Sequence, residues 1–210
     1  MLKRLVFLLS GRGSNLQALV QACREQAWPA QIAAVISNRP DSEGLAWARS
    51  QGLNTQVVDH TRFESRQAFD EALREVIDVH EPHGVVLCGF MRVLGDAFVE
   101  HFSGRLINIH PSLLPAFPGL KTHRQALEAG VKLAGATVHF VTPTLDHGPI
   151  IAQATVPVLP QDTEYTLAER VLQAEHRLYP MALGWFVRDE LQITGGLVSH
   201  RLGASQLLLP

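Results

Sequence analysis

The sequence predicts an α/β fold: a single domain in which helices cover both faces of a mainly parallel, twisted sheet. Short continuous apolar runs, which suit strands buried on both faces, alternate along the chain with segments of helical periodicity. Glycine turns directly follow two of the predicted strands, a common arrangement at the carboxyl ends of parallel strands. The 210 residues suffice for one sizeable core and are few for two, so we expect one domain.

The composition limits the classes of partner and compartment. The formal net charge is −2 at pH 7 and no run of Lys or Arg occurs, so the chain lacks the electrostatic footprint of a nucleic-acid-binding protein. No apolar stretch approaches the roughly 18 residues that indicate a membrane span. The two cysteines, Cys23 and Cys88, have no metal-binding spacing and are typical of free thiols in a reducing compartment. We therefore expect a cytoplasmic protein that binds small molecules and neither nucleic acid nor membrane, as a monomer or a homodimer.

The first predicted strand, residues 2–9, leads into a glycine loop, Ser10 to Asn15, and then into a helical pattern. Glycines let backbone N–H groups approach an anion, and a helix N-terminus adds partial positive charge, so this loop suits a phosphate. It lacks the third glycine of a dinucleotide fingerprint and the GK[ST] ending of a triphosphate loop, and the second strand does not end in an acid. A monophosphate bound by Gly13, Ser14 and Asn15 fits best, and a plain glycine turn with Ser14 as helix cap is the alternative.

The alternation of strands and helices continues along the rest of the chain. Further strands are predicted at residues 32–36, 55–58, 85–88, 106–110, 136–141 and 150–158, with an edge strand at 191–193. Helices are predicted at residues 42–51, at about 64–80 with a capping box formed by Thr61 and Glu64, around Ala126, and from a cap at Asp162 or Thr163 onward, with a kink at Pro180.

A polar pair on an otherwise buried strand marks the predicted chemical centre. Strand side chains alternate between faces, so Asn108 and His110 share a face, and Pro111 ends the strand directly after them. An amide donor beside an imidazole can hold an oxyanion and move a proton. Asp146, in the turn-rich loop from Thr142 to Pro149, can form an ion pair with His110. The alternatives are a buried His and Asn that merely satisfy each other, and a solvated turn Asp.

Two further groups bear on ligand binding. Met91, Val93 and Leu94 follow the glycine turn after the strand at 85–88 and can line an apolar slot for a flat ring, although their spacing also fits ordinary core residues. The ten histidines include no HxxxH, HExxH or Cys/His cluster, so we expect no metal site.

These motifs resemble one family over nearly the whole chain. Ser10-Gly11-x-Gly13-Ser14-Asn15, Gly89-Phe90-Met91-Arg92, the run from Asn108 to Pro115, and Leu145-Asp146-x-Gly148-Pro149 are similar to those of the folate-dependent phosphoribosylglycinamide formyltransferases. The resemblance implies a Rossmann-like formyltransferase fold. It also implies an enzyme of de novo purine biosynthesis that transfers the formyl group of its co-substrate 10-formyltetrahydrofolate to the amine of glycinamide ribonucleotide, giving formylglycinamide ribonucleotide and tetrahydrofolate without a metal.

The resemblance further implies roles for individual residues. Asn108, His110 and Asp146 match the catalytic residues of the family, and Gly13, Ser14 and Asn15 match its phosphate loop. Glu175 matches the acid that contacts the glycinamide part. The residues expected to bind the folate are Arg66, Met91, Arg92, Val93, Leu94, Asn108, Thr142, Leu145 and Asp146. The chain departs from the family pattern at His147, where a small residue is more usual, and at Lys121, where His is expected.

On this assignment residues 1–105 form a phosphate-binding half, residues 106–195 a catalytic and folate-binding half, and residues 196–210 a tail without an assigned role. Rival functions differ in their needs. A formyltetrahydrofolate hydrolase would pass the formyl group to water, and it would carry an N-terminal regulatory domain that a first strand at residue 2 does not favour. A methionyl-tRNA formyltransferase would need a further C-terminal domain and a basic surface, and a Rossmann dehydrogenase would need a dinucleotide fingerprint. A non-catalytic folate- or nucleotide-binding protein would keep the pockets without needing all three polar groups.

Overall fold

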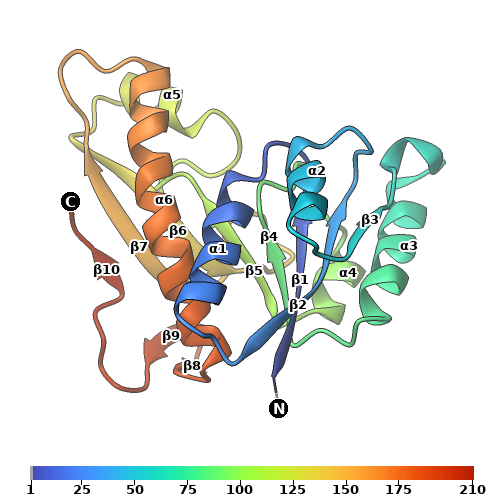
Figure 1. Cartoon of the computed structure of the whole chain (residues 1–210). Helices are drawn as coiled ribbons and strands as arrows, with labels where there is room; N and C mark the ends of the chain where they lie inside the picture. Colours follow the sequence, from blue (N-terminus) through green and yellow to red (C-terminus); the bar gives the residue numbers. More distant parts are fainter. Residues whose placement is uncertain (1) are drawn as a thin grey trace. The chain divides into compact units, whose positions relative to one another are not determined.

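A computed structural model describes residues 2–210 (Figure 1). The chain forms two compact units, one up to Asn108 and one from Ile109 onward, and strand β5 (Leu106–His110) runs across the division. Within residues 2–210, no helix is long and apolar enough to cross a membrane. The predicted single domain, with halves that divide after residue 105, stays a prediction.

The first unit is built on a parallel sheet whose strands pair in the order β5-β4-β1-β2-β3. Leu5 to Leu9 of β1 are completely buried, as the continuous apolar run predicts for a strand covered on both faces. The elements of this unit before β5 are β1 (Lys3–Leu9), α1 (Ser14–Glu25), β2 (Ala30–Ser37), α2 (Glu43–Ser50), β3 (Thr55–Val57), the 3₁₀ helix η1 (His60–Arg62), α3 (Arg66–Asp78), β4 (Gly84–Leu87) and α4 (Asp96–His101).

The strand order of the first unit determines where its helices lie. From β1 through β2 to β3 the chain moves toward one edge of the sheet, and from β3 it returns past β1 to β4 and β5. Because crossovers between parallel strands are right-handed, α1 and α2 cover one face and α3 and α4 the other. In agreement, α1 contacts α2, and α3 contacts α4. The direction of winding reverses between β1 and β4, which is where sheets of this kind form a ligand crevice at their carboxyl ends.

Two details of the first unit differ from the prediction. The capping box of Thr61 and Glu64 is wrong: Ser65 caps α3 and accepts a hydrogen bond from Ala68 N at 3.1 Å. Thr61 instead lies in η1, where its backbone N–H donates to Asp59 Oδ1 at 3.0 Å. Helix α4 was not predicted, because six residues are too few to show a helical period, and only tertiary packing reveals that Phe98 and Val99 are buried.

The second unit combines antiparallel and parallel pairing. Strand β6 (Leu133–Phe140) pairs antiparallel with β7 (Ile150–Pro157), and the short β10 (Leu207–Leu208) pairs parallel with β7 on its other side. Helix α6 (Glu164–Val187) packs against both β6 and β7 and also contacts α5 (Thr122–Glu128). Figure 1 shows α6 as the long orange helix beside these strands.

Thr163 is the N-cap of α6, one of the two caps predicted, and it forms a capping box with Thr166. Asp162 has another role. Both of its carboxylate oxygens bind the Arg170 guanidinium, at 2.7 and 2.8 Å, and these hydrogen bonds hold the pKa of Asp162 well below its usual range. The helix runs through Pro180 to Val187. The spacing of four and three residues predicts an apolar stripe, and all but one of its members are buried: Leu167, Val171, Ala174, Leu178 and Trp185, with Met181 half-buried.

A strand forms at the predicted residues 191–193, but it does not lie at the edge of the main sheet. Strand β8 (Leu191–Thr194) pairs only with β9 (Leu197–His200) among the described residues, in a separate two-stranded sheet. The turn between them is Gly195-Gly196, with φ of 58° and 81°, the backbone that a tight two-residue hairpin needs. The segment after residue 195, which matched no pattern, therefore contributes β9 and β10.

Candidate active site

A pocket of about 450 Å³ opens in the first unit between the segments that follow β1 and β4. It lies where the winding of the sheet reverses, so its position follows from the strand order. The predicted phosphate loop and two of the predicted folate residues line this same pocket. The lining residues are Ser10, Gly11, Arg12, Gly13, Ser14, Asn15, Asn38, Arg39, His60, Cys88, Gly89, Met91 and Arg92.

The phosphate loop is clamped by the start of α2. Ser42 Oγ and Gly44 N both donate to the Gly11 carbonyl oxygen, at 2.9 and 3.0 Å. Gly13 is the N-cap of α1 with a φ of 72°, and a Cβ added there would lie 3.0 Å from Gly44 Cα. Ser14 is the first residue of α1 and not its cap, and no side chain caps this helix. The expected cap role of Ser14 is therefore wrong, and the amides of the first turn are not capped by a side chain and can serve an anion.

The charge of this pocket favours an anion. Arg12, Arg39 and Arg92 line it, and its described lining includes no acid. Asn38 Oδ1 is buried and has no hydrogen-bond partner within residues 2–210, while His60 Nδ1 lies 2.8 Å from the Asn38 carbonyl oxygen. The sequence reasoning did not single out Arg12, Asn38, Arg39 or His60. Their shared signal is position, because each closely follows the carboxyl end of β1, β2 or β3.

The predicted folate residues of the first unit fall into two places. Met91 N donates to Ser10 Oγ at 2.8 Å, which joins the turn after β4 to the phosphate loop. Met91 is 75% exposed and Val93 56%, so only Leu94, at 9%, fits the alternative of an ordinary core residue. Arg66 does not line this pocket but a second one.

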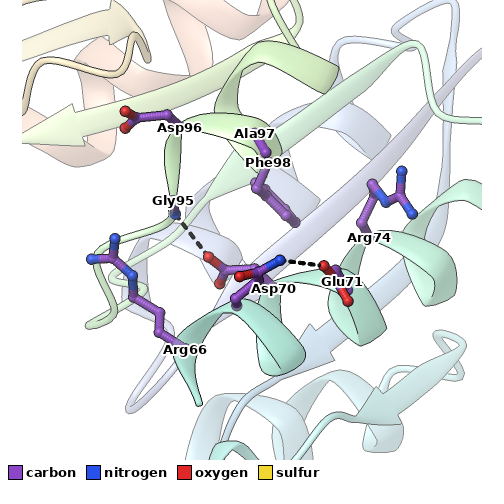
Figure 2. A pocket seen from close by; sticks show the side chains of 9 residues that line it. Arg66, Asp70, Glu71, Arg74, Gly95, Asp96, Ala97 and Phe98 are labelled. Atoms are coloured by element: carbon purple, nitrogen blue, oxygen red, sulfur yellow. Dashed lines mark hydrogen bonds between the residues drawn. The ribbon is translucent and has the colours of Figure 1, made fainter.

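That second pocket, of about 460 Å³, lies between α3 and α4 and is drawn in Figure 2. Arg66 and Arg74 stand on either side of Asp70, whose Oδ2 accepts a hydrogen bond from Gly95 N at 2.8 Å. Asp70 Oδ1 is buried and has no hydrogen-bond partner in the described chain. Burial raises the pKa of Asp70 above its usual value.

The second unit holds a buried histidine and aspartate pair. His110 ends β5, and its Nδ1 lies 3.5 Å from Asp146 Oδ2. The two side chains are 7% and 6% exposed, so the alternative of a solvated turn aspartate is wrong. The same Asp146 oxygen accepts from Gly119 N at 2.8 Å, and His110 Nε2 lies 3.0 Å from the Phe117 carbonyl oxygen. Both ring nitrogens thus lie close to an oxygen acceptor, which fixes the orientation of the imidazole ring.

The loop that carries Asp146 is tightly constrained. Asp146 has a φ of 54°, a conformation unusual for a residue other than glycine. A Cβ added at Gly148 would collide with the carbonyl oxygen of Phe140, so this position needs glycine. Among the predicted folate residues of this loop, Leu145 is exposed, and Thr142 Oγ1 donates to the Thr144 carbonyl at 3.3 Å.

The remaining predicted site residues, Asn108 and Glu175, lie on a strand and a helix. Asn108 lies two residues before His110 on β5, which gives both the same strand face, and its backbone is in register with Leu87 of β4. Glu175 is buried on α6, with 7% of its surface exposed.

Within residues 2–210, no group of three or more His, Cys, Asp or Glu side chains is arranged to hold a metal ion. Burial lowers the pKa of His123 and His139, which favours their neutral forms.

The fold and these residue sets define a class, an α/β protein with an arginine-lined pocket at the glycine loop and a buried imidazole–carboxylate pair. Residues 3–183 match the formyl transferase family. The chain belongs to this family, and within it to the phosphoribosylglycinamide formyltransferases. It is 49% identical over 189 residues to the phosphoribosylglycinamide formyltransferase of Escherichia coli K12, covering 90% of this chain and 89% of that protein.

Solved structures agree. The phosphoribosylglycinamide formyltransferase of Coxiella burnetii matches with a TM-score of 0.91 and 44% identity, covering 100% of this chain and 99% of that one. The glycinamide ribonucleotide transformylase 1 of Symbiobacterium toebii matches with a TM-score of 0.91 and 48% identity, covering 95% and 94%. A formyltetrahydrofolate deformylase from Pseudomonas syringae is also similar, with a TM-score of 0.88 and 27% identity, and this chain covers 66% of it. The predicted fold class and family are confirmed, and the rival hydrolase is not favoured.

Proposed function

We propose that this enzyme transfers the formyl group of 10-formyltetrahydrofolate to the amine of glycinamide ribonucleotide, in de novo purine biosynthesis. The family and the relatives at 44–49% identity support this reaction. The observation that carries the assignment of residues is the buried contact between His110 and Asp146, because it holds an ionisable donor in a fixed place. Both substrates enter as small molecules, and the chemistry described below needs no metal.

The anionic end of the ribonucleotide binds the first unit in this proposal. Gly13, Ser14 and Asn15 offer the backbone amides of the first turn of α1, and the helix adds partial positive charge at that end. Arg12 and Arg39 add full positive charges to the same pocket. A single phosphate group matches this set, and Glu175 is the group proposed to bind the glycinamide part.

The chemical step is proposed for Asn108, His110 and Asp146. The neutral amine attacks the formyl carbon, a carbon–nitrogen bond forms, and the formyl oxygen becomes an oxyanion that Asn108 and His110 stabilise by donating hydrogen bonds. When the bond to N10 of the folate breaks, N10 takes up a proton and the attacking nitrogen loses one. Asp146 holds the imidazole in orientation. Nε2 of His110 faces the Phe117 carbonyl oxygen at 3.0 Å. For a proton on Nε2 to reach the oxyanion or N10, the ring or that carbonyl must therefore shift.

The proposed folate contacts are Arg66, Met91, Arg92, Val93, Leu94, Asn108, Thr142, Leu145 and Asp146. Exposed apolar side chains at Met91, Val93 and Leu145 support this role, because an apolar side chain open to solvent can cover a flat ring. We also propose a cytoplasmic location, which the free thiols Cys23 and Cys88 support.

One experiment tests the function directly. The protein is incubated with 10-formyltetrahydrofolate, with and without glycinamide ribonucleotide, and folate absorbance is followed. Release of tetrahydrofolate that depends on the ribonucleotide is expected. Equal release without it would instead identify a hydrolase, and no release in either arm would leave a binding protein.

A further inference from the structure

The hydroxyl of Thr137 is a buried junction between the loop after His110 and the strands β6 and β7. Thr137 lies on β6 and is completely buried. Its Oγ1 donates to the Ser112 carbonyl oxygen at 2.7 Å and accepts from Leu114 N at 3.0 Å and from Gln153 Nε2 at 2.9 Å. A hydroxyl has one proton and two lone pairs, so these bonds use its whole capacity.

Gln153 completes the junction from the neighbouring strand. It lies on β7 directly across from Thr137 in the antiparallel register. Its Nε2 donates one proton to Thr137 Oγ1 and the other to the Leu114 carbonyl oxygen, both at 2.9 Å. Both backbone polar groups of Leu114 are therefore bound by these two side chains. The loop also packs closely on β6: Leu113 of the loop lies so near Gly135 of β6 that a Cβ added at Gly135 would collide with it.

The tethered loop is the one that surrounds the His110 ring. Ser112 N donates to the His110 carbonyl at 2.9 Å, and Ser112 Oγ donates to the Ala116 carbonyl at 2.6 Å. The next residue, Phe117, places its carbonyl 3.0 Å from His110 Nε2 and has a φ of 53°, which is strained for a bulky side chain. The position of that carbonyl relative to the ring thus depends on where Ser112 and Leu114 are held.

We propose that Gln153, acting through Thr137, is a positioning residue for His110. It touches neither substrate in this proposal, and it fixes the loop that orients the imidazole. The proposal rests on the role of His110 given above. A displacement of the order of 1 Å at a reacting group can lower the rate about 100-fold, so loss of the junction is expected to reduce kcat and to leave substrate affinity largely intact.

The test compares Gln153→Leu with a matched control in the same unit. Gln206 also uses its Nε2 for two hydrogen bonds, to the Ile151 carbonyl at 2.6 Å and the Val198 carbonyl at 3.2 Å, and like Gln153 it is half-buried. Gln206→Leu removes the same chemistry without touching the loop after His110. The measurements are kcat and both KM values, the melting temperature, and the side-chain ¹⁵N spectrum of His110.

We expect both variants to lose some thermal stability, while only Gln153→Leu loses about 10- to 100-fold in kcat, keeps both KM values within about threefold and shifts the His110 ring resonances. A folded Gln153→Leu with kcat within about threefold of the parent overturns the proposal, and so does an equal loss of kcat in Gln206→Leu. A parent protein without ribonucleotide-dependent transfer would refute the proposed function instead, so the two failures are distinguishable.

A second pair of variants covers the case in which Gln153→Leu does not fold. Thr137→Ser keeps the hydroxyl, whereas Thr137→Val keeps the shape and removes it. The proposal expects Thr137→Ser to retain most of kcat and Thr137→Val to lose it with little change in KM. Equal kcat in the two variants would overturn the proposal.

Discussion

Gly13→Ala should damage the phosphate pocket in two separable ways. Gly13 has a φ of 72°, and placing an L residue in this left-handed region costs roughly 1–2 kcal/mol. The new Cβ would also lie 3.0 Å from Gly44 Cα, a backbone atom that cannot swing aside, and such overpacking adds about 1–3 kcal/mol. The sum is about 2–5 kcal/mol, which for a chain of this size lowers the melting temperature by about 4–20 °C.

Gly52→Ala supplies the matched control. Gly52 has nearly the same φ, 73°, but a Cβ added there would meet nothing within 4 Å. It should therefore show the backbone cost alone, about 1–2 kcal/mol, or roughly 2–8 °C. The difference between the two variants measures the contact with Gly44. Equal melting temperatures for the two variants would show that this contact carries no strain.

Steady-state kinetics of Gly13→Ala then test the function of the loop. A shift of the first-turn amides should weaken charge-assisted hydrogen bonds to the phosphate and raise the KM for glycinamide ribonucleotide by about 10- to 100-fold. The KM for the folate should change far less, and Gly52→Ala should change neither. If Gly13→Ala raises both KM values equally, the loop is structural and our reasoning about the phosphate is wrong.

Three further outcomes are expected. Asn108→Ala should lose about 10²- to 10³-fold in kcat, the usual loss for one oxyanion donor, and a folded variant that loses less than about tenfold would remove Asn108 from the mechanism. Asp162→Asn should make the melting temperature depend less on pH in acid, because the Arg170 hydrogen bonds lower the pKa of Asp162 and its stabilisation, present at neutral pH, is lost as the pH falls below about 4. Melting temperatures that fall equally in both proteins between pH 6 and 3 would contradict this. Asp70→Asn should match or exceed the parent melting temperature at pH 7. Burial raises the pKa of Asp70, so its ionised form lowers stability above that pKa, whereas an amide oxygen can still accept from Gly95 N. A clear loss of melting temperature at pH 7 with none at pH 3 would refute a raised pKa for Asp70.

The parts of the fold that the sequence predicted are those set by local burial. Strands covered on both faces need unbroken apolar runs, so β1 and β4 are visible without any knowledge of their partners. The start of a helix depends on which nearby side chain is free to cap it: the Thr61 hydroxyl donates to Asp59 Oδ1 at 2.8 Å within η1, whereas Ser65, directly before α3, accepts from Ala68 N. The hairpin of β8 and β9 had a signal in Gly195-Gly196 that the reasoning did not use.

The candidate site was predictable where chemistry and chain position coincide, and not where it depends on register. Asn108 and His110 follow from strand alternation alone. The contact between His110 and Asp146 joins residues far apart in the sequence, so spacing could only offer it as one alternative beside a solvated turn. The junction of Thr137 and Gln153 needs the exact pairing of β6 with β7, which no periodicity specifies.

The two residues of β10 have a consequence for how the protein behaves at high concentration. A strand at the border of a sheet offers unpaired N–H and carbonyl groups, on which another chain can add and begin to aggregate. The outer side of β7 is partly covered by β10, whose residues Leu207 and Leu208 align with Gln153 and Ala154. A border strand of only two residues is too short to template a further strand. Strand β10 thus occupies the part of the β7 edge at Gln153 and Ala154 to which another chain could otherwise add.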